Sequence, residues 1–332
     1  MTFKYNNVYV EDTALVAGPY EKKGPLQSYF DMSYDDLKMG EKTWEDAESR
    51  ILEESVDILL LKCHKKNTDV DLLIAGDLLS QIVSSSYAAT RLGIPFFGIY
   101  NACATSVEGM ILASNMIEAN QIKNAVVSVS SHNNAAEKQF RYPVEYGGPK
   151  PKTTTFTTTG GASILLSSEL SSIRVESGTV GTPIDMGIKD AYNMGAVMAP
   201  ACAEVLYKHL KDTSREVGYY DMIFSGDLGI YGKKIFKDYM KLEYAIDLKN
   251  YDDTACMIFD IDSQSVYAGG SGPACLPLVS YGYVFSLMKK KELKRVLLIA
   301  TGALMSSAMV NEKHTIPAIA HAISLEVVEW FI

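Results

Sequence analysis

Cysteine is scarce in this sequence, and its few cysteines form no recognisable pairs. The 332 residues contain five, at Cys63, Cys103, Cys202, Cys256 and Cys275. The number is odd, and no two cysteines have the CxxC spacing. The common zinc-binding patterns are therefore excluded, and a disulfide framework is not expected. Such cysteine usage is typical of a protein from a reducing compartment.

The sequence also lacks a long apolar run and an excess of basic charge. Its longest apolar stretches, such as VLLIA at 296–300, are far shorter than the roughly 20 residues that span a bilayer. The first residues, MTFKYNNVYVEDT, are polar and contain no apolar core of a secretory signal. The formal net charge of −9 argues against a nucleic-acid-binding surface. We therefore expect a soluble globular protein without a nucleic-acid partner.

Periodic apolar residues organise the first part of the chain. Apolar residues at helical spacing predict helices over about residues 43–65 and 106–120. Short apolar runs predict buried strands within 70–81, 93–102 and 124–132. Strands that alternate with helices are typical of βαβ units, so we expect an α/β fold with a parallel sheet covered on both faces.

The composition changes between Arg141 and Gly161. The stretch RYPVEYGGPKPKTTTFTTTGG is rich in Pro, Gly and Thr and has no helical periodicity. It is longer than most connections between secondary-structure elements, and long loops in compact domains are often functional. Strands are then predicted again in ASILLSS (162–168) and SIRVESGTV (172–180).

Two segments of the first part return in the second part, in the same order. DLLIAGDL (71–78) returns as DMIFSGDL (221–228), at an offset of 150 residues. The stretch that begins with Ala-Cys at 102 returns at 274, so the offset has grown to 172 and the second copy carries 22 extra residues. Self-similarity of this kind indicates a duplicated structural unit.

Cys103 poses the functional question. It directly precedes a predicted helix, where the helix dipole favours a thiolate and backbone N–H groups can hold an oxyanion. It therefore suits a nucleophile. A small buried hydrophobic residue beneath a tight turn, or the floor of an anion-binding pocket, explains the same residue equally well.

ACAT at 102–105 resembles the cysteine elbow of the thiolase and ketoacyl synthase superfamily. Further segments spread over the chain are similar to one family of that superfamily, stage V sporulation protein AD of spore-forming bacteria. They include AGPYEKKGPLQSYFD (17–31), RYPVEYGGPKP (141–151) and AGGSGPAC (268–275). The resemblance implies a five-layer αβαβα fold built from two duplicated βαβ-rich halves, residues 1–172 and 173–332.

The resemblance also implies a function. The family is understood to bind dipicolinic acid (pyridine-2,6-dicarboxylic acid) for uptake into the developing spore, together with membrane proteins of the same operon. The resemblance to the superfamily also implies a homodimer. We expect it in the cytoplasm or forespore, peripherally associated with the inner spore membrane. No cofactor or metal is expected, and calcium enters only as the chelate of the ligand.

An enzyme of this superfamily needs a histidine and an asparagine, or histidines, from its second half. When the second-half segments are laid on the superfamily, these positions fall on Gly226 and Gly269. Neither segment contains a histidine or an asparagine. We therefore expect a binding protein and not an enzyme, with an acyltransferase that uses Cys103 as the alternative, and a pure docking scaffold as a third class.

The residues expected to bind the ligand come from both halves. Backbone N–H groups of the cysteine turn, glycine amides with a serine, and cations of the Pro/Thr-rich stretch all suit a dicarboxylate. The glycines are expected to leave space where catalytic side chains stand in the enzymes. The full set is Ala102, Cys103, Ala104, His132, Arg141, Lys152, Gly226, Asp227, Gly269, Gly270 and Ser271.

Overall fold

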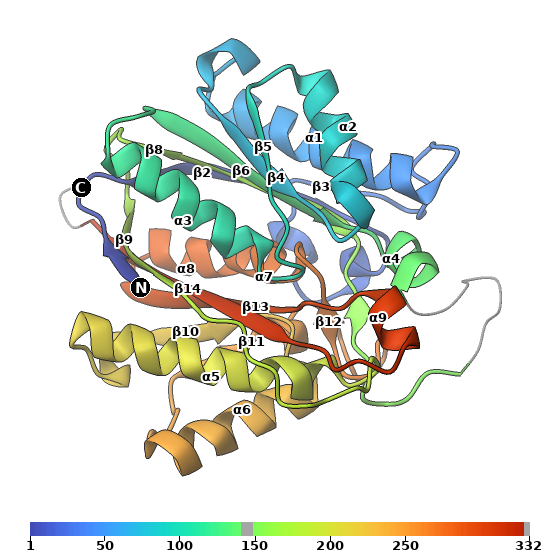
Figure 1. Ribbon diagram of the computed structural model, residues 1–332. Helices are drawn as coiled ribbons and strands as arrows, with labels where there is room; N and C mark the ends of the chain where they lie inside the picture. The colour runs from blue at the N-terminus through green and yellow to red at the C-terminus, as the bar shows by residue number, and fades with distance from the viewer. Residues whose placement is uncertain (141–148, 329–332) are drawn as a thin grey trace.

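The strands form two layers that lie between three layers of helices (Figure 1). The computed structural model describes residues 1–140 and 149–328. The outer layer of the first half contains α1 (Trp44–Lys62), α2 (Val83–Leu92) and α4 (Asn133–Phe140). The middle layer contains α3 (Thr105–Glu118), α7 (Cys275–Val279), a π-helical turn (Ser280–Val284) and α8 (Phe285–Lys289). The outer layer of the second half contains α5 (Met194–Thr213) and α6 (Gly229–Tyr244). The αβαβα arrangement expected from the sequence is confirmed.

The two strand layers have the same internal order. The first layer has the order β5-β4-β6-β8-β2, and the second has the order β11-β10-β13-β14-β9. The first layer consists of β2 (Tyr9–Ala17), β4 (Leu73–Gly76), β5 (Phe96–Gly98), β6 (Asn124–Ser131) and β8 (Gly160–Ser167). The second consists of β9 (Ile173–Val180), β10 (Met222–Ser225), β11 (Tyr251–Asp253), β13 (Arg295–Ala303) and β14 (Ala318–Val327). The division at residues 172 and 173 stays a prediction, although this order repeats on either side of it.

Short elements complete the fold. They are the strands β1 (Thr2–Lys4), β3 (Met32–Ser33), β7 (Phe156–Thr157) and β12 (Gly270–Ser271), the helix α9 (Ser307–Asn311), and the 3-10 turns Glu21–Lys23, Gln27–Tyr29, Asn67–Asp69, Ser80–Ile82, Val217–Tyr219 and Thr254–Cys256. The two layers are continuous, because β2 pairs with β9 through Tyr9–Arg174 and Val10–Ile173. None of the helices within 1–140 and 149–328 combines the length and apolar character that a bilayer crossing requires.

The sheet is mixed, so the expectation of a parallel sheet is wrong in part. In the first layer β5, β4 and β6 run parallel, but β8 is antiparallel to both β6 and β2. The second layer repeats this with β14, which is antiparallel to both β13 and β9. Parallel neighbours require a long crossover, whereas β13 and β14 are joined through the five-residue α9 and can run antiparallel.

The predicted helix at 43–65 and the predicted strand at 93–102 had different outcomes. Helix α1 forms as expected, with the Thr43 side chain accepting a hydrogen bond from the Asp46 N–H (3.0 Å) at its first turn. Strand β5 forms, but it is not buried, and Phe97 keeps 53% of its surface exposed. The reason is position, because β5 is the last strand of its layer and no described strand covers its outer edge.

The repeated segments occupy equivalent places in the two layers. DLLIAGDL forms β4 and DMIFSGDL forms β10, and each strand is second from its edge. The two Ala-Cys segments open α3 and α7, which lie side by side in the middle layer (Figure 1). The extra residues of the second copy lie in the longer α6 and in the stretch 254–271, which ends in β12. Through this stretch, Ser271 of the second half reaches the cavity beside the Cys103 turn.

Candidate functional site

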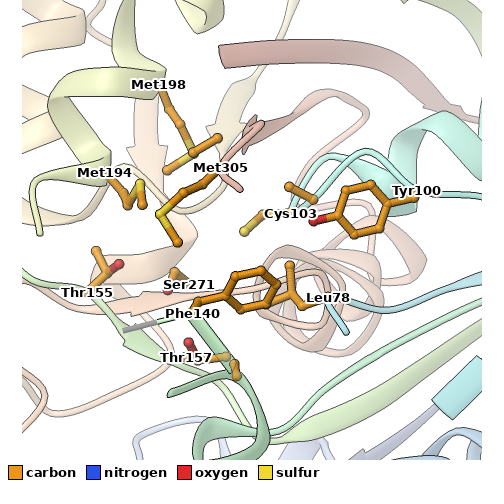
Figure 2. A pocket seen from close by; sticks show the side chains of 13 residues that line it. Leu78, Tyr100, Cys103, Phe140, Thr155, Thr157, Met194, Met198, Ser271 and Met305 are labelled. Carbon is orange, nitrogen blue, oxygen red and sulfur yellow. The ribbon is translucent and has the colours of Figure 1, made fainter. Parts of the chain in front are cut away.

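The Cys103 turn is a sharp elbow between β5 and α3. Ala102 has a φ of 51°, in the left-handed region that non-glycine residues rarely adopt. The turn is closed by hydrogen bonds from the Ala104 N–H to the Asn101 carbonyl (3.0 Å) and from the Thr105 hydroxyl to the Ala102 carbonyl (2.6 Å). Strained conformations of this kind persist only where the surrounding structure imposes them. The elbow presents the partly exposed Cys103 side chain toward a cavity (Figure 2).

Two glycines let strands from both halves approach the elbow. A Cβ atom on Gly76 of β4 would lie 2.2 Å from the Ile99 carbonyl oxygen. A Cβ atom on Gly302 of β13 would lie 2.4 Å from the Asn101 carbonyl oxygen and 3.1 Å from the Ala104 nitrogen. The two distances to carbonyl oxygens are shorter than real Cβ contacts, so only glycine fits at either position. The elbow is therefore held between the two strand layers.

The cavity in front of Cys103 holds about 60 Å³ and is lined by both halves (Figure 2). Its walls are mainly apolar, with hydroxyl groups of Tyr100, Thr155, Thr157 and Ser271 as the polar part. The full lining consists of Leu78, Tyr100, Ala102, Cys103, Ala136, Phe140, Thr155, Thr157, Met194, Met198, Ser271, Ala303 and Met305. No lysine, arginine or histidine is among these described lining residues.

The threonine-rich stretch forms one wall of the cavity. Its strand β7 pairs in parallel with β12 of the second half, with hydrogen bonds from the Phe156 N–H to the Gly269 carbonyl and from the Thr158 N–H to the Ser271 carbonyl (both 2.8 Å). Side chains alternate along a strand. Thr155 and Thr157 therefore face the cavity, and the Phe156 ring packs on the far side against Phe259 at 5.6 Å.

Three of the expected binding residues line this cavity, namely Ala102, Cys103 and Ser271. Arg141 lies outside the described residues. Lys152 is exposed and is not part of the lining. His132 is buried away from it, with its Nε2 2.8 Å from the Leu37 carbonyl oxygen. Burial lowers the pKa of His132 to about 4, so its ring is neutral at pH 7.

Gly226, Gly269 and Gly270 were expected to leave space where catalytic side chains stand in the enzymes, but neighbouring atoms fill that space. A Cβ atom on Gly226 would lie 3.0 Å from the Leu276 Cβ, so that position is already filled. Gly269 has a φ of 112°, and its Cβ would lie 2.5 Å from the Ala255 carbonyl oxygen. A Cβ atom on Gly270 would lie 2.7 Å from the Ile258 Cγ2 and 3.0 Å from the Cys275 Sγ. The expectation of a vacated pocket at these positions is wrong, because the main chain and the middle-layer helix occupy it.

Two further expected residues support the site without lining it. Ala104 is fully buried, and its N–H is used within the elbow, as the Thr105 N–H is through the Ala102 carbonyl (3.4 Å). These donors are therefore already engaged in closing the turn. Asp227 is fully buried at a φ of 70°, and burial raises the pKa of its carboxyl group well above the usual range. Burial therefore favours the neutral form of this carboxyl group.

His321 is far from the elbow in the sequence, but the structure brings the two together. The Asn101 side-chain nitrogen lies 3.0 Å from the His321 Nε2, across the boundary between the two halves. Burial lowers the pKa of His321 to about 4. Burial also raises the pKa of Glu108 to about 7, although its hydrogen bond with Asn101 acts in the opposite direction. This group lies beneath the elbow and outside the cavity lining.

Sequence reasoning also missed most of the apolar wall. Met194 and Met198 lie one turn apart at the start of α5, and Met305 follows β13. Met194 and Met198 have the i, i+4 spacing of a single helix face, but this spacing equally describes a core helix. The alternation of Thr155 and Thr157 around Phe156 was the clearer signal in the sequence. No group of three His, Cys, Asp or Glu residues in the described part of the chain is placed to hold a metal ion.

The comparisons with known proteins agree on a family. The family model described as Stage V sporulation protein AD matches residues 1–326. A curated protein of Bacillus subtilis (strain 168) with the same description is 43% identical over 320 residues, which cover 96% of this chain and 94% of that protein.

Solved structures with low sequence identity share the fold. A variant of OleA from Xanthomonas campestris has a TM-score of 0.62 at 15% identity, covering 98% of this chain and 99% of that one. The 3-oxoacyl-[acyl-carrier-protein] synthase III of Aquifex aeolicus has a TM-score of 0.59 at 11% identity, covering 96% and 99%. At these identities the likeness concerns the fold alone.

Proposed function

The chain belongs to the stage V sporulation protein AD family, and we propose that it binds dipicolinate in the cavity in front of Cys103 without catalysing a reaction. One observation supports this most directly. The cavity joins both halves around the elbow, yet no described lining residue is a histidine, lysine, arginine or carboxylate that could serve as general acid or base.

The cavity chemistry suits a planar aromatic dicarboxylate. Phe140 and the methionines offer apolar contact to a ring, and the hydroxyls of Thr155, Thr157 and Ser271 can donate to carboxylates. Methionine side chains are unbranched and flexible, so those of the lining can adjust to the shape of a bound ring. The calcium chelate is the second form to test, because bound calcium neutralises ligand charge in a lining with no described cation.

Replacing Met305 by tryptophan should weaken dipicolinate binding about fivefold or more. Met305 is partly exposed and lines the cavity, so a larger ring there fills space that the ligand needs. Overpacking a closed site typically costs roughly 1–3 kcal/mol. Isothermal titration of the purified chain with dipicolinate, with and without calcium, measures the change.

The matched control is Met309→Trp, since Met309 is 44% exposed on the neighbouring α9 and does not line the cavity. Equal affinity of the Met305 variant and the parent would place the ligand elsewhere. No heat with either ligand form would favour a docking scaffold instead. An acyl adduct on Cys103 after incubation of the same samples with acetyl-coenzyme A, seen by intact mass, would favour the alternative, an acyltransferase.

We also propose that the protein is a homodimer, paired through the outer edge of β5. This edge has no described strand partner, and Phe97 and Tyr87 beside it are 53% and 62% exposed. Two copies related by a two-fold axis can pair such edges in an antiparallel way. Sedimentation equilibrium should give twice the chain mass, and Phe97→Glu should give one chain mass. Leu170→Glu, at a position that is 66% exposed, is the control and should remain dimeric.

The proposed biological role is dipicolinate uptake into the developing spore. The protein would act in the cytoplasm or forespore, peripherally associated with the inner spore membrane. Its partners would be the other stage V sporulation membrane proteins of the same operon. Family membership supports this role, and no cofactor or resident metal is proposed.

A further inference from the structure

Helix α6 carries two adjacent rows of exposed side chains with different chemistry. Lys234, Lys237 and Lys241 form one row, and Tyr231, Ile235 and Leu242 form the other. Together these six residues are termed the α6 patch. The opposite side of the helix is buried through Phe236 and Met240. The helix lies in the outermost layer of the second half (Figure 1), and all six residues of the patch are exposed.

The apolar row is unusually exposed for residues of its type. Leu242 keeps 80% of its surface exposed, more than any other large hydrophobic residue of the described chain. Tyr231 is 41% exposed and Ile235 is 36% exposed. Single exposed hydrophobic residues are common, but these three share one side of one helix. The row therefore offers an apolar contact that no described part of this chain covers.

The lysine row has no ion-pair partner among the described residues. No ion pair involves Lys234, Lys237 or Lys241 within residues 1–140 and 149–328. Their neighbour Lys233 differs, because its Nζ lies 2.5 Å from an Asp252 carboxylate oxygen. The chain as a whole has a net charge of −9, so a row of three unpaired cations is a local exception. Such a row attracts a surface of negative charge.

Acidic residues lie within the α6 patch and at both of its ends. Asp238 lies between the two rows, and Glu243 is exposed at the end of the helix. At the other end, Ile230 lines a hollow with Asp260 and Asp262, so it is excluded from the patch. The cationic and apolar character is thus concentrated between Tyr231 and Leu242, about three turns of helix.

We propose that the α6 patch docks the protein on an anionic phospholipid surface. Lysines beside tyrosine and leucine on one exposed helix face are the composition of interfacial helices, in which cations meet headgroups and apolar side chains enter the boundary below them. None of the described pockets is lined by patch residues, so the patch offers no groove of the kind that a partner helix would need. The inference rests on the proposed peripheral location and adds a direct lipid contact to it.

The test is binding of the purified full chain to vesicles. Phosphatidylcholine vesicles with a large fraction of phosphatidylglycerol should bind the protein at low salt and release it at high salt. Each lysine near an anionic surface changes the partition coefficient about fivefold, so Lys234→Gln, Lys237→Gln and Lys241→Gln together should lower it roughly a hundredfold. Leu242→Ser should lower it about tenfold, and Asp238→Asn should raise it.

The first half supplies matched controls. Lys42, Lys66 and Lys123 are exposed in connecting segments of the first half, and their triple change to glutamine alters the net charge equally. Leu61 is 76% exposed on α1 and is the control for Leu242. Equal loss in patch and control variants would overturn the proposal, because net charge alone would then explain binding. Equal binding to pure phosphatidylcholine, or no binding to anionic vesicles, would also overturn it.

The same variants separate this inference from the ligand proposal. The α6 patch contains none of the cavity-lining residues, so dipicolinate affinity should be unchanged in all patch variants. Failure to bind vesicles with normal dipicolinate binding would reject the lipid contact alone. Normal vesicle binding without dipicolinate binding would reject the ligand and leave the lipid contact in place.

Discussion

Replacing Gly302 by valine should abolish measurable dipicolinate binding and lower the free energy of unfolding by roughly 2–3 kcal/mol. The Cβ of any larger residue would lie 2.4 Å from the Asn101 carbonyl oxygen, which belongs to the elbow and to main chain that cannot rotate away. Either the elbow or β13 must shift, and both carry cavity-lining residues on their ends. Calorimetric titration and urea unfolding measure the two effects.

The control for Gly302 is Gly218→Val. Gly218 is exposed, and a Cβ atom there would meet no atom within 4 Å. This variant should bind and unfold like the parent. If the Gly302 variant kept its ligand affinity while losing stability, the elbow would not be part of the binding site. If it lost affinity with unchanged stability, the strand and elbow would have more freedom to separate than the packing indicates.

Replacing Glu21 by glutamine should make the protein more stable at pH 9, by a few kcal/mol, and change little at pH 5. Glu21 is fully buried, and burial raises the pKa of its carboxyl group to about 8 from the usual value near 4.5. The folded state therefore binds a proton that the unfolded state releases between these values. Stability that depends on this proton is complete at low pH and is lost as the pH rises toward 8 and beyond.

Glutamine keeps the acceptor that Glu21 provides. The Thr159 N–H donates to the Glu21 Oε1 at 2.9 Å, and an amide oxygen can accept the same bond without carrying charge. Urea unfolding from pH 5 to pH 9 should show a shallower decline for Glu21→Gln than for the parent and for the exposed control Glu292→Gln. Some decline should remain, because burial also raises the pKa of Asp253 to about 7. Identical slopes would contradict the assignment.

Local patterns predicted the elements well and their surroundings poorly. Helices α1 and α3 follow directly from apolar residues at helical spacing, and strand β4 follows from a short apolar run that is buried along its whole length. The position of β5 at an edge depends on the order of strands, which no local pattern contains. The antiparallel β8 and β14 likewise depend on how distant strands meet.

For a similar reason, only part of the candidate site could be predicted from the sequence. Cys103 and Ser271 were found because the elbow and the glycine-rich stretch are local motifs. Met194, Met198 and Met305 were missed because α5 and the end of β13 reach the cavity only through the tertiary fold. Gly269 was misjudged because its meaning depends on the direction of a Cβ atom that the sequence does not specify, and that direction is toward Ala255.

The pairing of β7 with β12 has a consequence for the timing of synthesis. One wall of the cavity is complete only when Ser271 has reached Thr157, and the opposite wall waits for Ala303 and Met305. A chain emerging from the ribosome therefore completes this cavity only after residue 305 has been added. A ligand of this cavity would find the complete lining only in a chain that has been synthesised beyond residue 305. A chain truncated before residue 305 would lack part of the lining.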